Sequence, residues 1–307
     1  MLARRIASAA SLIGVTLLFI VADAFELGGA PAGLWMLPIY LFLVCGTAYE
    51  FASLLRSQAD LAPTKCTGVV AAGAVIGAVP VYYPLIAGRR YPTDCPIGIV
   101  GWATIAVAAA IGLLLIDAIR SYARTRQSIV AQLAAGTLVA AYCLSFAHFL
   151  ICLRLSPPDR DGLLLLIGVV AVTKMSDTGA YFLGRSFGRT PLHRVISPKK
   201  TIEGAIGGIL AAVITAVLYY QIFFPAVSGG EAKELTLFRG LALTLSGAAI
   251  AVVALIGDLS ESLIKRSCNA KDSSGLLPGL GGVWDVTDSL FFVAPLAYLC
   301  AVAGWIG

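Results

Sequence analysis

Charged residues are scarce in this chain. Asp, Glu, Lys and Arg make up 13% of the sequence, whereas hydrophobic residues make up 59%. A soluble globular domain is typically about half apolar and about a quarter charged. The composition therefore excludes an ordinary soluble domain and favours a protein that resides in lipid.

Long neutral stretches separate the few charges. Five of them exceed the roughly 18 apolar residues that indicate a spanning helix: 27–49, 66–88, 95–116, 127–153 and 204–230. Shorter or more polar candidates are 6–22, 162–183, 240–264 and 286–306. Since an open sheet cannot satisfy its backbone hydrogen bonds in lipid, the sequence predicts an all-α polytopic integral membrane protein. We expect about nine transmembrane helices.

The first of these segments has a second interpretation. The start "MLARR", an apolar run and "VADA" are also typical of a secretory signal with a small-residue cleavage site. We favour a retained span, because an inner-membrane protein with many spans rarely needs a cleaved signal. Either interpretation leaves the orientation of the other segments unchanged.

The sequence also lacks metal-binding cysteine pairs, internal repeats and Ser/Gly linkers. Its seven cysteines include no CxxC pair, which favours apolar packing residues over a metal or disulfide framework. We therefore expect one continuous membrane domain. In it, residues 1–160 form the N-terminal transmembrane helices and residues 161–307 form the C-terminal catalytic transmembrane region.

The distribution of Lys and Arg predicts the orientation in the membrane. If the N-terminus is cytoplasmic and the spans alternate, cytoplasmic segments hold 15 Lys and Arg residues and the opposite side holds six. Cytoplasmic loops are normally enriched in these cations. We expect a multi-pass protein of the cell (inner or plasma) membrane whose N-terminus and polar loops are cytoplasmic. Because the cations are spread over several loops, nucleic acid is not an expected partner.

Charge is concentrated in two segments, 174–203 and 258–288, which together hold 16 of the 39 charged side chains. In the second segment, Asp258 and Glu261 are three residues apart and share a helix face near a span end. A carboxylate at membrane depth is costly and suggests a functional role. Asp285 and Asp288 are also three residues apart, at the start of the last span. Acids at two helix ends, joined by a glycine-rich loop, would converge on one cation such as Mg²⁺.

Cations accompany these acids. Lys265, Arg266 and Lys271 suit a polyphosphate, whose charge they would offset. Gly281 and Gly282 would let the backbone approach a phosphate closely. The alternative is an amphipathic interfacial loop with solvated charges and turn-forming glycines. The acids, cations and glycines taken together favour a functional site.

The first charged segment ends in "SPKKTIEG". Ser197 or Thr201 can cap the helix that carries Glu203. Lys199 and Lys200 would then lie near the N-terminus of that helix, which is a favourable place for an anion. Upstream, the small residues of "TGAYFLG" permit close helix packing.

The stretch "GDLSESLIKRSCNAKDSSGLLPGLGGVWDVTDSL" resembles the signature of the phosphatidate cytidylyltransferase (CDP-diacylglycerol synthase) family. That pattern reads S-x-x-K-R, four residues, K-D, then P-G-x-G-G, and ends in D-x-x-D. The earlier "SDTGAYFLGRSFGR" and "SPKKTIEG" resemble a second block of the family. The resemblance covers roughly residues 165 to 307, and the N-terminal half matches only in its hydrophobic character.

Two positions depart from the family pattern. Leu280 stands where the family often has His, and Val286 stands where it often has Arg. A phosphate monoester is already largely dianionic at neutral pH, so we expect it to act as a nucleophile without that His. Another cation can replace the phosphate contact of the missing Arg.

The resemblance implies that CTP transfers its cytidylyl group to phosphatidic acid in the bilayer. The products would be CDP-diacylglycerol, used in phospholipid biosynthesis, and pyrophosphate. It implies Mg²⁺ as cofactor, with a monovalent cation such as K⁺ beside it. The predicted catalytic residues are Asp258, Lys271, Asp272, Asp285 and Asp288. The predicted metal ligands are Asp258, Asp285, Asp288 and Asp177. The predicted phosphate- or substrate-binding residues are Ser197, Lys199, Lys200, Thr201, Glu203, Ser262, Lys265, Arg266, Gly281 and Gly282.

Other functions remain open at this point. A CTP-dependent polyprenol or other lipid kinase would share some of the nucleotide chemistry. An ion-coupled transporter would also use acids within the membrane, but it predicts polar residues spread across several spans. A non-catalytic scaffold explains none of the paired acids. Small-residue helix faces suggest a homodimer.

Overall fold

The computed structural model describes residues 2–58, 61–63, 65–122, 129–156, 160–229, 234–277 and 281–307, except for the side chains of residues 2–9 and 160. Leu280, the first departure from the family pattern, therefore lies outside the described residues, as do Pro278 and Gly279.

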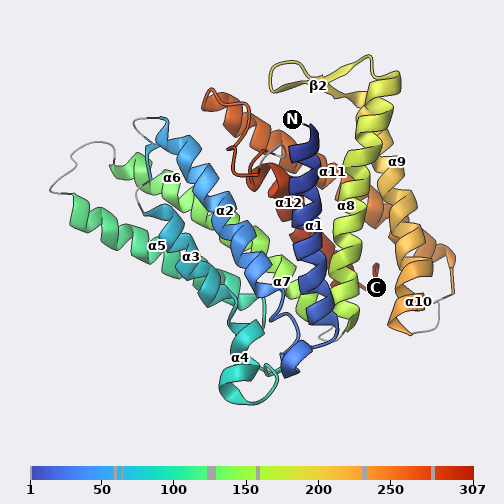
Figure 1. The fold of residues 1–307 in the computed structure, drawn as a ribbon, viewed down its shortest axis with the longest axis horizontal. Coiled ribbons are helices and arrows are strands. Elements are labelled where there is room, and N and C mark those ends of the chain that lie inside the picture. Colours follow the sequence, from blue (N-terminus) through green and yellow to red (C-terminus); the bar gives the residue numbers. More distant parts are fainter. Residues whose placement is uncertain are drawn as a thin grey trace. The chain divides into compact units, whose positions relative to one another are not determined.

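Helices dominate the described chain, as predicted (Figure 1). The α-helices are α1 (Leu2–Ala24), α2 (Leu37–Arg56), α3 (Cys66–Gly77), α4 (Val79–Ala87), α5 (Gly101–Ser121), α6 (Ile129–Ala141), α7 (Ala147–Leu155), α8 (Arg160–Phe187), α9 (Ile202–Leu218), α10 (Phe224–Ser228), α11 (Leu237–Ser267) and α12 (Trp284–Val302). The described residues also include the short helical turns η1 (Leu27–Gly29), η3 (Tyr142–Phe146) and η4 (Tyr219–Phe223). The last two are π-helical and join α6 to α7 and α9 to α10.

Each predicted span falls on a helix or on a run of joined helices. Among the described residues, 7 helices are long and apolar enough to cross a membrane, or up to 8 if a bent pair counts as one span. The described apolar part of α1, Ala10–Ala24, is shorter than these. The multi-pass helical architecture is thus confirmed, whereas the predicted count of nine is not.

The bent pair is α3 and α4, which the sequence predicts as a single segment. The two helices meet at 55°. Pro80 is in the first turn of α4. Because proline lacks a backbone N–H and its ring clashes with the carbonyl four residues earlier, Pro80 favours a break between the two helices at this point.

One short sheet interrupts the helices. β1 (Pro191–His193) pairs antiparallel with β2 (Ser197–Thr201). This hairpin lies between α8 and α9, within the first charged segment. It places Lys199 and Lys200 directly before α9, as predicted.

The chain forms two compact units. The first comprises Met1–Cys152 and Ser267–Thr287, and the second comprises Leu153–Arg266 and Asp288–Gly307. In the first unit, α2 and α5 both contact α3 and α6. In the second unit, α8 and α9 lie side by side along their lengths (Figure 1).

The contact between α8 and α9 depends on glycine. A Cβ atom on Gly179 would lie 2.4 Å from the Cβ of Ala211 and 2.7 Å from the carbonyl oxygen of Gly207. A Cβ atom on Gly207 would lie 2.9 Å from the carbonyl oxygen of Gly179. The helix backbones are therefore close enough that neither position has room for a side chain, which confirms the packing predicted for "TGAYFLG".

All seven cysteines are free. Five of them are buried: Cys66, Cys143, Cys152, Cys268 and Cys300. This agrees with their predicted role as small apolar packing residues.

Candidate active site

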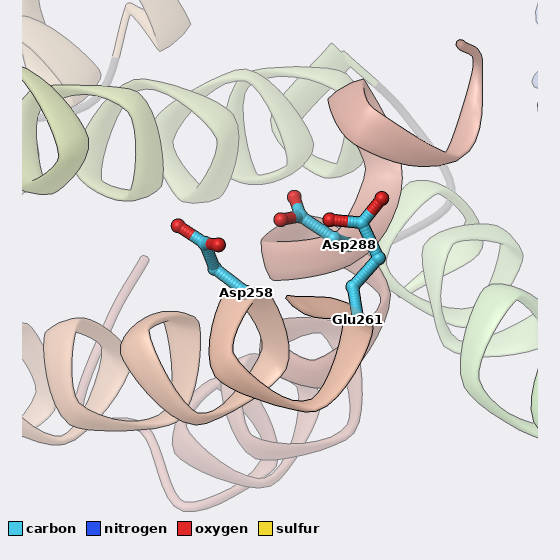
Figure 2. A group of neighbouring side chains, drawn as sticks. All are labelled: Asp258, Glu261 and Asp288. Carbon is cyan, nitrogen blue, oxygen red and sulfur yellow. The ribbon is translucent and has the colours of Figure 1, made fainter. Parts of the chain in front are cut away.

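Three carboxylates of the second unit lie together. Asp258 and Glu261 extend from neighbouring turns of α11, and Asp288 extends from α12 (Figure 2). One ligand oxygen from each of the three lies within 4.8 Å of the others. Glu261 and Asp288 are buried, and Asp258 is half-buried. Within the described part of the chain, this is the group of acids arranged to hold a metal ion.

A close approach of two helices brings these acids together. Gly257, which precedes Asp258 on α11, is buried. A Cβ atom there would lie 2.7 Å from the carbonyl oxygen of Asp288 and 3.1 Å from the Cβ of Phe292. Glycine thus lets α11 touch α12 at this level. The spacing of three residues then brings Glu261 to the same face as Asp258.

Two lysines neutralise part of the negative charge. The Nζ of Lys265 lies 2.9 Å from Oε2 of Glu261, one helical turn away on α11. The Nζ of Lys200, from β2, forms an ion pair with Oδ2 of Asp258. Lysines from both predicted charged segments therefore contact the acidic cluster.

Asp288 and Asp177 complete the surroundings of the cluster. Oδ1 of Asp288 accepts hydrogen bonds from the backbone N and the hydroxyl of Ser289, at 2.6 and 3.0 Å. On α8, Asp177 is 3.2 Å from the ammonium group of Lys174. Asp177 is therefore ion-paired, and its role as a metal ligand stays a prediction.

The predicted capping arrangement at α9 is present. Oγ1 of Thr201 accepts a hydrogen bond from Gly204 N at 3.1 Å. The carboxylate of Glu203 accepts hydrogen bonds from the backbone N atoms of Arg189 and Thr190, at 3.1 and 3.2 Å. Glu203 therefore fixes the chain between α8 and β1.

The other predicted phosphate-binding residues of the second unit are more accessible. Lys199 and Arg266 are exposed, and Ser197 and Ser262 are half-buried. Ser262 follows Glu261 on α11, and Ser197 begins β2. Their contacts with substrate stay predictions.

Asp285 belongs to the first unit and has a different environment. Its Oδ2 accepts hydrogen bonds from Ser273 N at 3.2 Å, from the Ser273 hydroxyl at 2.9 Å and from Gly282 N at 2.6 Å. Lys271 and Asp272 are exposed just before this segment. The metal role predicted for Asp285, and the catalytic roles of Lys271 and Asp272, stay predictions.

The two predicted phosphate-binding glycines contact acids. Gly281 has a φ of 95°, which disfavours any residue with a side chain. A Cβ atom on Gly281 would lie 2.5 Å from Oδ2 of Asp285. A Cβ atom on Gly282 would lie 2.2 Å from Oε2 of Glu50. Carboxylates of the protein therefore occupy the Cβ side of both glycines.

The sequence prediction omitted two acids from its site. Glu261 was placed on the correct helix face but was not assigned a metal role; its spacing from Asp258 was an available signal. Glu50 was not considered. It is the one charge between Glu26 and Arg56, and it is fully buried in α2.

The fold and the clustered acids and lysines define a multi-pass α-helical membrane protein with a polar site built on its C-terminal helices. The sequence model of the cytidylyltransferase family matches residues 3–303. The chain belongs to this family.

Several relatives carry the name phosphatidate cytidylyltransferase, among them proteins from three bacteria. The protein from Synechocystis sp. is 40% identical over 46% of this chain and 44% of its own length. The Bacillus subtilis protein is 36% identical over 53% and 55%. The Haemophilus influenzae protein is 38% identical over 50% and 51%. The chain spans about half the length of the curated relatives it matches.

Proposed function

We propose that this protein transfers the cytidylyl group of CTP to phosphatidic acid, giving CDP-diacylglycerol and pyrophosphate. Membership of the cytidylyltransferase family supports the reaction class. The names of the relatives support the lipid substrate. The many apolar helices support an acceptor that stays in the bilayer.

The observation that carries this proposal is the cluster of Asp258, Glu261 and Asp288 with Lys200 and Lys265. A carboxylate cluster alone would suit a cation, and lysines alone would suit a phosphate. Here the two kinds of side chain are in direct contact, at 2.9 Å for Lys265 and Glu261. The cluster therefore offers negative charge to a metal ion and positive charge to the phosphates of a metal-bound triphosphate.

The cluster fits Mg²⁺ by the chemistry of its donors. Mg²⁺ takes oxygen ligands, usually from one or two carboxylates together with phosphates and water. Asp258, Glu261 and Asp288 offer such oxygens within 4.8 Å of one another. Mg²⁺ held there would act as a Lewis acid toward the α-phosphate and offset the charge of the leaving pyrophosphate. A monovalent cation such as K⁺ beside it remains an expectation from the family.

The basic residues would bind and orient the nucleotide. Lys200 lies just before the N-terminus of α9, where the helix dipole also favours an anion. When the nucleotide binds, the ammonium group of Lys200 would leave Asp258 and bind a phosphate oxygen instead. Lys265 is held on α11 by Glu261, so its charge is fixed at the cluster. This arrangement positions the triphosphate before the reaction begins.

The reaction balances without further reactants. An oxygen of the phosphatidic acid phosphate attacks the α-phosphorus of CTP and forms a new P–O bond. The bond from the α-phosphorus to the oxygen that bridges to the β-phosphorus breaks, and its electron pair leaves with pyrophosphate. The attacking phosphate monoester is largely dianionic at neutral pH, so the chain does not need a strong base.

The membrane location and assembly belong to the proposal as well. We infer an inner or plasma membrane protein whose N-terminus and site face the cytoplasm, where CTP is available. A homodimer stays a prediction. The small residues of α8 give it no support, since Gly179 packs against α9 within one chain.

Incubating the purified protein with radiolabelled CTP, phosphatidic acid and Mg²⁺ tests the function. We expect labelled CDP-lipid when the label is on the α-phosphate, and labelled pyrophosphate when it is on the γ-phosphate. A lipid kinase would instead release CDP and transfer the γ-label to lipid. Ion movement into vesicles without CTP, with no CDP-lipid formed, would favour a transporter.

A further inference from the structure

Glu50 is a buried acid that binds the segment between Ser273 and Trp284, here called the signature loop. Its side chain is fully buried in α2. Oε2 accepts hydrogen bonds from the Ser273 hydroxyl at 2.7 Å and from Trp284 N at 2.8 Å. Oε1 accepts hydrogen bonds from the Ser274 hydroxyl at 2.6 Å and from Val283 N at 2.8 Å. The carboxylate thus holds both ends of the loop.

The two backbone donors explain why an acid is needed here. Val283 and Trp284 lie at the start of α12, where helix N–H groups have no partner within the helix. Anionic groups are stabilising at this end of a helix. Hydrogen bonds to an ionised acceptor are roughly twice as strong as neutral ones. Four such bonds compensate for burying the carboxylate.

The surrounding face of α2 fits the start of α12. Gly46 is one turn before Glu50, and a Cβ atom there would lie 2.9 Å from the Cγ1 of Val283. Phe51 stacks on Trp284 with ring centroids 4.2 Å apart. Oγ1 of Thr47 is 2.8 Å from Oγ1 of Thr287. One face of α2 therefore makes a continuous contact with the start of α12, through Gly46, Thr47, Glu50 and Phe51.

The loop itself is built around this carboxylate. Leu277 and Gly281 exchange two backbone hydrogen bonds, of 2.9 and 3.1 Å, which join the two described parts of the loop, 273–277 and 281–284. The Cβ position of Gly282 is occupied by the Glu50 carboxylate, 2.2 Å away. The hydroxyl of Ser273 lies 2.7 Å from Oε2 of Glu50 and 2.9 Å from Oδ2 of Asp285. Glu50 is therefore connected to Asp285 through one serine.

We propose that Glu50 is a positioning residue for cytidylyl transfer. It holds the signature loop, and with it the preceding residues Lys271 and Asp272, in the conformation that the reaction requires. All four donors around Glu50 come from the protein, so it acts through the loop and does not touch substrate. This inference rests on the proposed function, because the contacts of the loop with substrate are themselves part of that proposal.

The variant Glu50→Gln tests the inference with little change in size. Val283 N donates to one carboxylate oxygen and Trp284 N donates to the other. Whichever way the glutamine amide is turned, its NH₂ group faces one of these N–H donors. The loop therefore loses a backbone hydrogen bond and meets a repulsive contact.

Two measurements on full-length protein in detergent give the readout. The first is hydrogen exchange of peptides covering residues 273–287, which needs no activity. The second is steady-state formation of CDP-lipid from CTP and phosphatidic acid. In Glu50→Gln we expect faster exchange of these peptides, a higher KM for CTP and a kcat/KM lowered about 100-fold, as for other small misplacements of reacting groups.

A matched control separates positioning from general damage to the helix. Thr47→Val removes a buried polar contact between α2 and α12 and leaves Glu50 and the loop intact. We expect it to keep the wild-type exchange of the loop and the wild-type KM. A purely structural role of Glu50 would reduce the fraction of active protein and leave the KM for CTP unchanged, which would overturn the proposal.

A second variant keeps the proposal testable if Glu50→Gln does not fold. Ser274→Ala removes one donor to Glu50 from the loop surface, and we expect a smaller change of the same kind in exchange and KM. Wild-type values for both would overturn the proposal. If wild-type protein forms no CDP-lipid, the proposed function fails. In that case the exchange of the loop still decides whether Glu50 holds it.

Discussion

The molecule contains two groups of carboxylates whose partners differ. In the first unit, Glu50 and Asp285 accept hydrogen bonds from hydroxyl and backbone N–H groups of one loop. In the second unit, Asp258 and Glu261 are paired with lysine ammonium groups. Backbone donors are fixed and cannot leave their acceptor, whereas a lysine is flexible and can move to a phosphate. The same type of side chain therefore stabilises a loop in one unit and remains available for ligands in the other.

Removing a carboxylate from the lysine-paired cluster should have the largest effect. We expect Asp288→Asn to lower kcat/KM about 1,000-fold, since even partners of metal ligands contribute 10–100-fold. Activity should not recover at high Mg²⁺. Asp258→Asn should behave in the same way. The melting temperature in detergent serves as the control for folding, and near-normal turnover in either variant would rule out the metal assignment.

Adding a methyl group at Gly282 should destabilise the other group of carboxylates, Glu50 and Asp285 of the first unit. The new Cβ atom would lie 2.2 Å from Oε2 of Glu50 and 2.0 Å from the Ser273 hydroxyl. Overpacking of this kind costs about 2 kcal/mol, so we expect Gly282→Ala to lower the free energy of unfolding by that amount. Gly275→Ala is the matched control, because no atom of the described residues, apart from its own chain neighbours, lies within 4 Å of its Cβ position. Equal stability of the two variants would contradict the crowding at Gly282.

Lys200 and Lys199 allow a comparison within one strand. Lys200 pairs with Asp258, and Lys199 is exposed. A hydrogen bond to a charged group contributes about 1.5–3 kcal/mol, so Lys200→Ala should raise the KM for CTP about 10- to 150-fold. Lys199→Ala should change it less. A larger effect at Lys199 would show that the phosphates bind on the exposed side of the hairpin.

Asp285→Asn should have the smallest effect of these substitutions, and it tests whether Asp285 belongs with Glu50 or with the metal-binding acids. Three hydrogen bonds to Asp285 end on Oδ2, and the amide oxygen of Asn can take that place. If Asp285 only holds the loop, loss of charge assistance weakens it by about 1 kcal/mol, and kcat/KM should fall about fivefold. A loss as large as that of Asp288→Asn would restore Asp285 as a metal ligand.

Hydropathy was sufficient to predict the fold class, because each apolar stretch must bury its backbone in a helix. It was not sufficient to count the spans. The run 66–88 reads as one segment, yet Pro80 divides it into α3 and α4. The β1–β2 hairpin was also missed, since "RTPLHRVISPKK" has no clear alternation of polar and apolar residues.

The candidate site was only partly predictable, because local spacing does not reveal partners that are distant in sequence. Spacing placed Asp258 and Glu261 on one face, and the structure brings Asp288 to them. The same spacing argument grouped Asp285 with Asp288. It could not anticipate that an acid in the first turn of α12 would bind its own loop. The partners of Glu50 are distant in sequence, and nothing local in "AYEFASL" indicates them.

The contact of Glu50 with Val283 also constrains biosynthesis, because it joins residues 233 positions apart. A ribosome completes nearly the whole chain after Glu50 before Val283 is made. Until then the glutamate lacks its two backbone donors, Val283 N and Trp284 N, and a product terminated before them never acquires them. Acquisition of the loop structure is consequently a late event in membrane insertion, and it marks chains that were synthesised at least through the start of α12.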